Sequence, residues 1–359
     1  MVGFNNLGNT CYMNAVLQCL YHILDLRNII NNLDYNNINY ENTLFFNLKK
    51  LFNIIQNTNE SSINIQFVKD IISLKNNYFN NYNQHDSHEL LLFIYDSLFT
   101  ELGKKVNLNI KCNKNIIEIK QIYNKLKLVK NNNNLTNKYK LLLENLKKKY
   151  KRDIITIQHL IIHKNYFNNS YSPLIKLLFG HYISIILCNS CKFEKYIFEP
   201  YNIISLEIPT QNNISLYDCF TLSNINIDLN CSNKWECSNC KKLVNAKKQV
   251  LYWDFPNILT IHLKRFINLS KNDKFIEIPF KLDLNKFKCN LNYENTNNYI
   301  YECIGIICHS GSYSGGHYFS FCRKNLNWFM CNDSIYKQIN LDLSLINKLS
   351  YILFYKKIG

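Results

Sequence analysis

The sequence predicts an α+β fold in which helices come first and antiparallel strands follow. Residues 1 to about 100 place apolar side chains at helical spacing, whereas short segments rich in β-branched and aromatic residues predominate from about residue 175. A Lys- and Asn-rich stretch with weak periodicity separates the two parts. Helices followed by a separate run of strands are typical of the α+β class.

The composition indicates a globular protein that buries a large core. The chain has 359 residues, of which 47% are apolar, so one elaborated domain or two domains can form. The formal net charge is +16, which we attribute to lysines on solvated surfaces. The densest basic cluster, residues 147–152, lacks a ladder of aromatic side chains, so we do not expect nucleic-acid binding.

The sequence favours a reducing compartment, either the cytoplasm or the nucleus. The N-terminus has no charged region followed by an apolar stretch, so we see no signal peptide. The apolar run 174–188 is interrupted by Lys176 and His181 and is too short to span a bilayer. We therefore expect no membrane association, and we expect the 14 cysteines to be thiols, metal ligands or a nucleophile rather than disulfides.

Two strong helices are predicted before residue 100. Apolar residues from Ala15 to Leu24 recur on one face of a helix that starts near Cys11. Asp86 to Phe99 forms the second helix, with Asp86 as the N-cap and Glu89 in the capping-box position. We interpret residues 101–170 as an insertion, partly helical around Leu141 to Tyr150 and partly mobile.

The second half of the chain is predicted to form strands, because its apolar segments are short and rich in β-branched and aromatic residues. The expected strands are Tyr182 to Cys188, Ile197 to Ile208, Gln249 to Trp253, Ile258 to Phe266, Tyr299 to Cys308, Tyr318 to Cys322 and Tyr351 to Tyr355.

Cys11 and His317 are candidates for a nucleophile and a general base, although they lie near opposite ends of the chain. Cys11 follows the turn Gly8-Asn9-Thr10 and would occupy the first turn of its helix, where the backbone dipole favours a thiolate. His317 follows two glycines at the start of a strand. Asn332 or Asp333, after the next strand, could orient the imidazole as a third member. Alternatively, Cys11 is a small buried hydrophobe and His317 a packed or surface residue.

Two pairs of cysteines predict a structural zinc site. Cys188 and Cys191 form one C-x-x-C turn, and Cys237 and Cys240 form another. Two such turns complete a tetrahedral four-thiolate shell, which implies one zinc per chain and no open coordination position. Chance spacing in a Cys-rich chain is the alternative.

These segments together resemble the ubiquitin-specific protease family of deubiquitinating enzymes. GFNNLGNTCYMNAVLQCL is similar to its Cys box, QHDSHEL to its QQD box, and SYSGGHYFSFCR with WFMCNDS to its His box. Further segments match in the family's order, and only residues 101–170 lack an equivalent. The resemblance implies a papain-like cysteine peptidase in a right-hand arrangement: one catalytic domain, 1–359, with a helical thumb (1–100), the insertion (101–170), zinc-bearing β fingers and the start of the palm (175–255), and an antiparallel β palm with the His box (256–359).

Carried over by position, the resemblance assigns roles to individual residues. Cys11 becomes the nucleophile, His317 the general base and Asn332 the third triad member, with Asp333 beside it. Asn6 falls on the oxyanion-stabilising position. The residues expected to bind the basic C-terminal tail of ubiquitin are Gln84, Asp86 and Glu89, together with Gly316.

The implied activity is thiol-dependent cleavage after the terminal glycine of ubiquitin, on ubiquitinated proteins, by a monomer. Two departures stand out, since His85 replaces the second Gln of the QQD box and Asn332 cannot stabilise an imidazolium as a carboxylate would. A catalytically silent ubiquitin-binding module and an enzyme for a ubiquitin-like modifier are the alternatives.

Overall fold

The computed structural model describes residues 2–33, 40–129, 132–224, 226–291, 297–313 and 315–358. Every site residue predicted above lies within these ranges, whereas residues 130 and 131 of the predicted insertion lie outside them.

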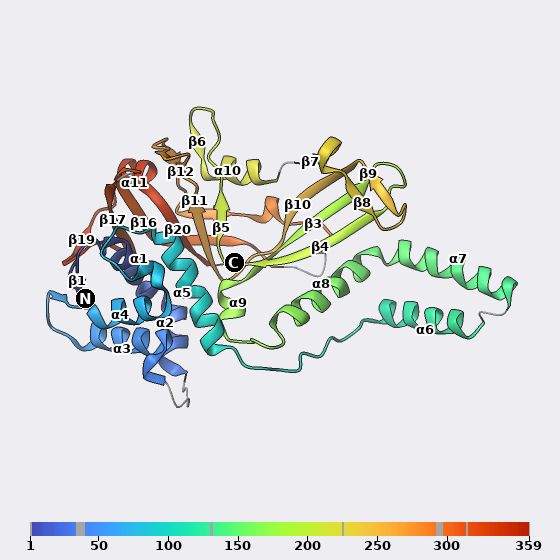
Figure 1. Cartoon of the computed structure of the whole chain (residues 1–359), viewed down its shortest axis with the longest axis horizontal. Helices are drawn as coiled ribbons and strands as arrows, with labels where there is room; N and C mark the ends of the chain where they lie inside the picture. Colours follow the sequence, from blue (N-terminus) through green and yellow to red (C-terminus); the bar gives the residue numbers. More distant parts are fainter. Residues whose placement is uncertain are drawn as a thin grey trace.

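The helical part contains both predicted helices and three more. Its members are α1 (Cys11–His22), α2 (Leu24–Asn32), α3 (Leu44–Asn57), α4 (Gln66–Lys75) and α5 (Ser87–Leu102), and they gather at one end of the molecule (Figure 1). All but the last residue of α1 are buried, because this helix runs through the core and contacts β17 (Gly315–Lys324). Asp86 caps α5 by accepting a hydrogen bond from the His88 backbone. The predicted capping box is wrong, since Glu89 is exposed and hydrogen-bonds with the Tyr78 hydroxyl instead.

The insertion is far more helical than predicted. It contains α6 (Lys114–Leu128), α7 (Asn133–Lys149) and α8 (Lys151–Phe167). The helices α6 and α7 pack against each other and extend to the end of the molecule opposite to α1, while α8 packs on strand β4 (Figure 1). Asn113 and Asn132 cap α6 and α7 through bonds of 3.0 and 3.1 Å to backbone N–H groups. The expectation of one short helix failed because α6 and α7 bury only a few apolar residues, which leaves a weak periodic signal.

Two sheets organise the rest of the chain. The larger has the order β19-β18-β17-β16-β20-β11-β5, with β15 also paired to β16, and the smaller has the order β4-β3-β10-β7. Their strands are β3 (Gly180–Cys188), β4 (Glu194–Tyr201), β5 (Ile204–Leu206), β7 (Ile227–Leu229), β10 (Ala246–Asp254), β11 (Ile258–Leu263), β15 (Lys281–Asp283), β16 (Ile300–Ser312), β17, β18 (Asn327–Asn332), β19 (Ile335–Ile339) and β20 (Ser350–Lys357).

Short elements complete the fold. They are β1 (Gly3–Phe4), β2 (Ser62–Ile63), β6 (Ile214–Ser215), β8 (Trp235–Cys237), β9 (Lys242–Val244), β12 (Phe266–Ile267), β13 (Ser270–Lys271), β14 (Ile276–Glu277), α9 (Leu174–Leu178), α10 (Leu216–Ser223) and α11 (Leu343–Leu349).

The predicted strand Ile197 to Ile208 is two strands in different sheets. The chain bends at residues 202 and 203, so that β4 belongs to the smaller sheet and β5 to the larger. The pairing is antiparallel in most of the larger sheet, as expected, but β5 runs parallel to β11. A continuous β-branched and aromatic run therefore does not show where a strand leaves one sheet for another.

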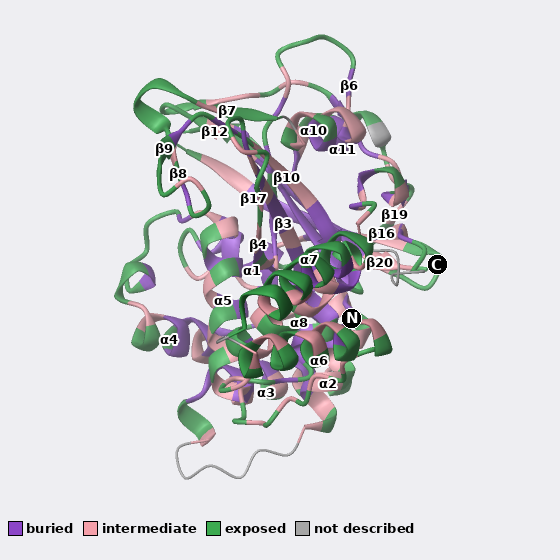
Figure 2. Cartoon of the chain, turned by 90° about the vertical axis from the view of Figure 1, so that its right-hand side faces the viewer, coloured by how far each residue is buried: buried purple, intermediate pink, exposed green. Residues whose placement is uncertain are grey.

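The larger sheet separates two hydrophobic clusters. Ile307 and Phe354 face the cluster formed with the helical part, whereas their neighbours Ile306 and Leu353 face the cluster that includes α10 and α11. This alternation follows from the two-residue repeat of a strand. Figure 2 shows buried residues concentrated on the central strands and exposed residues along the surrounding helices. The sheet is thus covered on both faces, and α1 packs on its strands β16, β17 and β18.

Candidate active site

The thiol of Cys11 lies in the first turn of α1, at the positive end of the helix dipole. Thr10 is the N-cap, but its side chain makes no capping bond because its hydroxyl accepts a hydrogen bond of 2.9 Å from the Leu7 backbone. The backbone N–H groups of the first helical turn therefore keep their capacity to stabilise an anion. Cys11 is only 2% exposed, so the thiol is shielded from bulk water.

The imidazole of His317 lies between Cys11 and Asn332. Its Nε2 donates to Asn332 Oδ1 over 2.6 Å, which leaves Nδ1 for the hydrogen bond with Cys11. That bond with Cys11 is the main cause that raises the pKa of His317 to about 9, and the bond with Asn332 adds to it against the opposing effect of burial. Because β17 pairs antiparallel with β18, the start of one strand and the end of the other lie together. The fold thus joins the two ends of the chain in one constellation.

Asp333 does not hydrogen-bond with His317 but holds the loop that precedes Cys11. Its carboxylate accepts bonds of 2.9 Å from Asn6 Nδ2 and 2.8 Å from Asn14 Nδ2. Asn6 Oδ1 accepts from the backbone N–H groups of Gly8 and Thr10, at 3.0 and 3.1 Å. Both the oxygen and the nitrogen of the Asn6 amide are therefore fixed by hydrogen bonds. One of its two N–H groups donates to Asp333, and the other remains for a ligand, since the Asn6 side chain is exposed.

Gln84 and Gly316 bind each other directly. Gln84 Nε2 donates to the Gly316 carbonyl over 2.5 Å, and the Gly316 N–H donates to Gln84 Oε1 over 3.1 Å. A Cβ atom at Gly316 would lie 2.3 Å from His309 Nε2, so the close packing against His309 requires glycine here. These contacts fasten the start of β17, next to His317, to the segment before α5.

The two acidic residues of α5 lie in different surroundings. Asp86 uses both carboxylate oxygens, since Oδ1 accepts from the His88 backbone over 2.7 Å and Oδ2 accepts from the Tyr351 hydroxyl over 2.6 Å. Burial raises the pKa of Asp86. Glu89 is exposed, so its carboxylate, which hydrogen-bonds with the Tyr78 hydroxyl, can also receive a cationic ligand. His85, in the variant position of the box, is buried and hydrogen-bonds with Asn81 Oδ1 over 2.8 Å.

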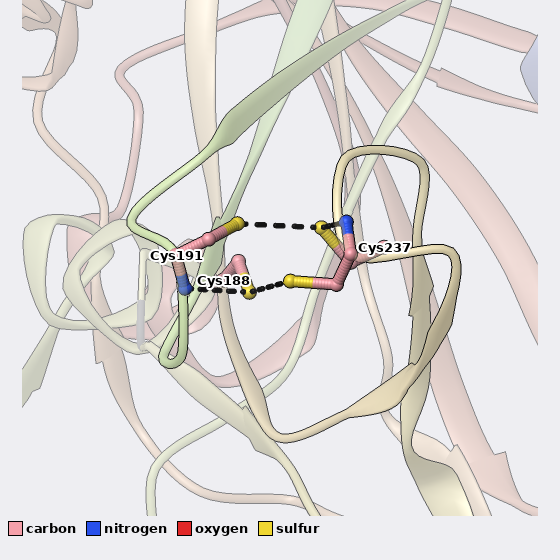
Figure 3. Close-up of side chains that lie close together, drawn as sticks. Cys188, Cys191 and Cys237 are labelled. Carbon is pink, nitrogen blue, oxygen red and sulfur yellow. Dashed lines mark hydrogen bonds between the residues drawn. The ribbon is translucent and has the colours of Figure 1, made fainter.

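The four cysteines of the two C-x-x-C turns converge as a zinc shell requires (Figure 3). Cys188 Sγ lies 3.9 Å from Cys240 Sγ, and Cys191 Sγ lies 3.7 Å from Cys237 Sγ. A tetrahedron with zinc–sulfur bonds of about 2.3 Å has edges of roughly 3.8 Å, which agrees with these separations. Backbone N–H groups of Cys191 and Cys240 donate to the first sulfur of each turn. This group could hold a structural zinc ion.

Several polar contacts of the site had no signal in the sequence. Asn14, within the buried face of α1, supports Asp333, and Tyr351 on the last strand supports Asp86. Both are long-range pairings, which spacing in one chain cannot indicate. None of the helices in the described ranges is both long and apolar enough to cross a membrane.

Comparisons with known proteins agree with this geometry. A family model described as ubiquitin carboxyl-terminal hydrolase matches residues 2–355. The chain is 26% identical to a probable ubiquitin carboxyl-terminal hydrolase of Acanthamoeba polyphaga mimivirus, over 99% of the chain and 90% of that protein. It is 27% identical to ubiquitin carboxyl-terminal hydrolase 5 of Saccharomyces cerevisiae, over 100% of the chain but 45% of that protein. The chain thus spans less than half of this yeast relative.

A solved structure supports the predicted fold class. The SAGA DUB module Ubp8/Sgf11/Sus1/Sgf73 bound to monoubiquitin contains a chain that superposes with a TM-score of 0.70 at 21% identity, covering 100% of this chain and 69% of the other. A second structure, of the same module bound to ubiquitin aldehyde, matches with the same score and identity. The predicted α+β fold and the predicted family are confirmed.

Proposed function

Because the chain belongs to the ubiquitin carboxyl-terminal hydrolase family, whose members are cysteine-type ubiquitinyl hydrolases, we propose that it removes ubiquitin from protein conjugates. The observation that carries this proposal is the Cys11–His317–Asn332 constellation, in which the thiol and the imidazole share a hydrogen bond. The scissile bond is the isopeptide or peptide bond after the C-terminal glycine of ubiquitin.

The reaction begins with attack by the Cys11 thiolate on the carbonyl carbon of that glycine. The carbonyl oxygen becomes an oxyanion, for which the free N–H of Asn6 and the backbone N–H of Cys11 are the proposed donors. The His317 imidazolium then gives its proton to the leaving lysine amine, and the C–N bond breaks to leave a thioester on Cys11. Water, deprotonated by His317, attacks the thioester and releases ubiquitin.

Asn332 and Asp333 have positioning roles in this proposal. Asn332 fixes the orientation of the His317 ring through Nε2, so that Nδ1 faces the thiol. Asp333 fixes the Asn6 amide. The exposed Glu89 is the better candidate for binding a basic tail, while Asp86 supports α5 from its buried position. For the tail to reach the Gly316 backbone, Gln84 must exchange its bonds with Gly316 for bonds with the substrate.

We also assign one structural zinc to Cys188, Cys191, Cys237 and Cys240. The four-sulfur geometry leaves no ligand position for water, so the ion would support the β8–β9 hairpin and the end of β3 without entering the chemistry. Elemental analysis should find this zinc in the purified chain, and Cys188→Ser should lose it together with the order of the hairpin. None of the 14 cysteines, all of which lie in the described ranges, forms a disulfide, which suits the cytoplasm or the nucleus.

The decisive experiment uses a fluorogenic substrate attached to the ubiquitin C-terminus together with a ubiquitin electrophile probe. The wild-type chain should hydrolyse the substrate and form a covalent adduct, and Cys11→Ala should do neither. Binding of ubiquitin without either reaction would indicate a silent binding module. Reaction with probes of other ubiquitin-like modifiers, but not with ubiquitin, would assign the chain to those modifiers. Full activity of Cys11→Ala would exclude Cys11 as the nucleophile.

A further inference from the structure

A second cluster of potential metal ligands lies where the insertion meets the smaller sheet. His159 and His163 are four residues apart on α8, so both face the same side of that helix. They meet His181, near the start of β3, and Asp254, the last residue of β10. The ring nitrogens that the three histidines offer all lie within 4.8 Å of one another.

The distances within this cluster are those of a preformed ligand set. His163 Nδ1 lies 3.0 Å from His181 Nε2. Two nitrogens bound to one zinc at about 2.0–2.1 Å in a tetrahedron lie roughly 3.3 Å apart, so a small adjustment would suffice. His181 Nδ1 lies 3.0 Å from Asp254 Oδ1. A carboxylate that accepts from the far nitrogen of a ligating histidine is the usual support in metal sites, because it turns the other nitrogen toward the ion.

His159 provides an independent sign of a missing ligand. His159 as a whole residue is 8% exposed, and its Nε2 has no hydrogen-bond partner within the part of the chain that the structure describes. The carboxylate oxygen Oδ2 of Asp254 lies 3.9 Å from His159 Nε2, beyond hydrogen-bond range. Leaving a buried polar atom without a partner is unfavourable, and coordination of a cation would remove that cost.

The cluster borders a cavity that gives access to an ion. The cavity holds about 490 Å³ and is lined by His159, His163, His181 and Asp254 together with Lys176 and Lys357. The alternative is a purely hydrogen-bonded histidine network, which would account for His163 and His181 but not for His159 Nε2.

We propose that His159, His163 and His181, supported by Asp254, bind a divalent transition-metal ion of the zinc class. Imidazole ligands suit zinc, cobalt and nickel rather than calcium or magnesium, whose preferred ligands are oxygens. Three protein ligands leave a position for water from the cavity, so this ion exchanges more readily than one in the four-cysteine group. It ties α8, and with it the insertion, to the base of the smaller sheet. The inference does not depend on the proposed hydrolase activity.

The test measures cobalt uptake by the purified full-length chain after its tight-binding zinc has been quantified. The wild type should bind about one further cobalt ion per chain, with a spectrum that lacks the intense thiolate-to-cobalt charge-transfer absorption. The double variant H159Q/H163Q should lose this uptake and keep the zinc of the cysteine group. His85→Gln is the matched control, because it removes a buried imidazole outside the cluster and should bind cobalt as the wild type does.

Each outcome decides the proposal. Absence of further cobalt on the wild type overturns it without reference to any variant. Equal uptake by the wild type and by a folded H159Q/H163Q also overturns it, as does a thiolate charge-transfer band, which would place the cobalt on cysteines. If circular dichroism shows that the double variant is unfolded, His163→Gln alone replaces it, since the His163 ring is only half-buried. Its cobalt affinity should fall at least tenfold.

Discussion

A double-mutant cycle on Asn6 and Asp333 can test whether Asp333 acts on the reaction only through Asn6. Asn6 is proposed to stabilise the oxyanion, and Asp333 holds its amide through a bond of 2.9 Å. Asp333→Asn is the appropriate change, because residue 333 has a φ of 47°, a conformation that Asn tolerates better than Ala. The variant keeps the shape and replaces the charged acceptor by a neutral amide with one oxygen for the two donors Asn6 and Asn14.

The expected effects follow from the bonds involved. Asn6→Ala removes an oxyanion donor, which typically lowers kcat about 10²–10³-fold with little change in KM. A hydrogen bond to a charged group contributes about 1.5–3 kcal/mol and a neutral one about 0.5–1.5 kcal/mol. Asp333→Asn should therefore weaken the hold on Asn6 by about 1–1.5 kcal/mol, which corresponds to a loss of roughly 5- to 10-fold in kcat.

The assay is hydrolysis of the fluorogenic ubiquitin substrate by the wild type, both single variants and the double variant. Because Asp333 acts through Asn6, the double variant N6A/D333N should be about as slow as Asn6→Ala alone. A further 5- to 10-fold loss in the double variant would show that Asp333 acts independently of Asn6 and would refute this reasoning. Circular dichroism and unchanged KM values would show that the fold and ubiquitin binding survive.

Three further predictions concern the residues around Cys11 and His317. In a pH–rate profile, kcat/KM should fall as pH rises through about 9, where the His317 imidazolium loses its proton. Asn332→Asp should shift this fall to higher pH, because a carboxylate stabilises the imidazolium. An unshifted profile would contradict the assigned geometry. Glu89→Gln should raise KM for ubiquitin several-fold and leave Tm unchanged. Asp86→Ala should lower the free energy of unfolding by about 1 kcal/mol or more, because α5 loses its N-cap. Thermal unfolding of both variants checks this, and a lower Tm for Glu89→Gln than for Asp86→Ala would contradict it. Gly316→Ala should reduce kcat/KM more than tenfold in a folded protein, because its Cβ would collide with the His309 ring and displace the start of β17.

The sign of the His317 shift also fixes its effect on stability. The folded-state pKa of about 9 lies above the ordinary value, so the native state favours the protonated ring. This contribution to stability is fully present below the unfolded-state pKa, near 6.5, and is lost as pH rises through about 9. Since the group is partly exposed, solvent screening keeps the contribution small.

The parts of the fold that could be predicted are those with local signals. The start of α1 at Cys11, the cap at Asp86 and the two C-x-x-C turns depend on residues within one turn or one helix. The insertion was misjudged because two of its helices are mostly solvated, so polar residues mask the apolar stripe. The Asn caps at Asn113 and Asn132 were visible in the sequence and could have corrected the interpretation.

The histidine cluster shows where local reasoning ends. The four-residue spacing of His159 and His163 is typical of two metal ligands on one helical face. The sequence alone, however, does not indicate a third ligand for a segment interpreted as an insertion. His181 and Asp254 join only because β3 and β10 pair across the smaller sheet, with Asp254 opposite His181 in register. A strand register of this kind depends on the whole sheet and cannot be obtained from spacing along the chain.

The joining of the two catalytic segments depends on their backbone neighbours more than on the catalytic pair. A neutral side-chain hydrogen bond contributes only about 1 kcal/mol net, too little to hold the chain ends together. The Phe4 N–H donates to the Asp333 carbonyl over 2.7 Å, and a Cβ at Gly3 would lie 2.1 Å from the Ser334 carbonyl oxygen. The N-terminal strand thus lies directly on the turn that carries Asp333. The hydrogen bond between Cys11 and His317 can therefore break and re-form during the reaction, because these backbone contacts keep the two segments in place.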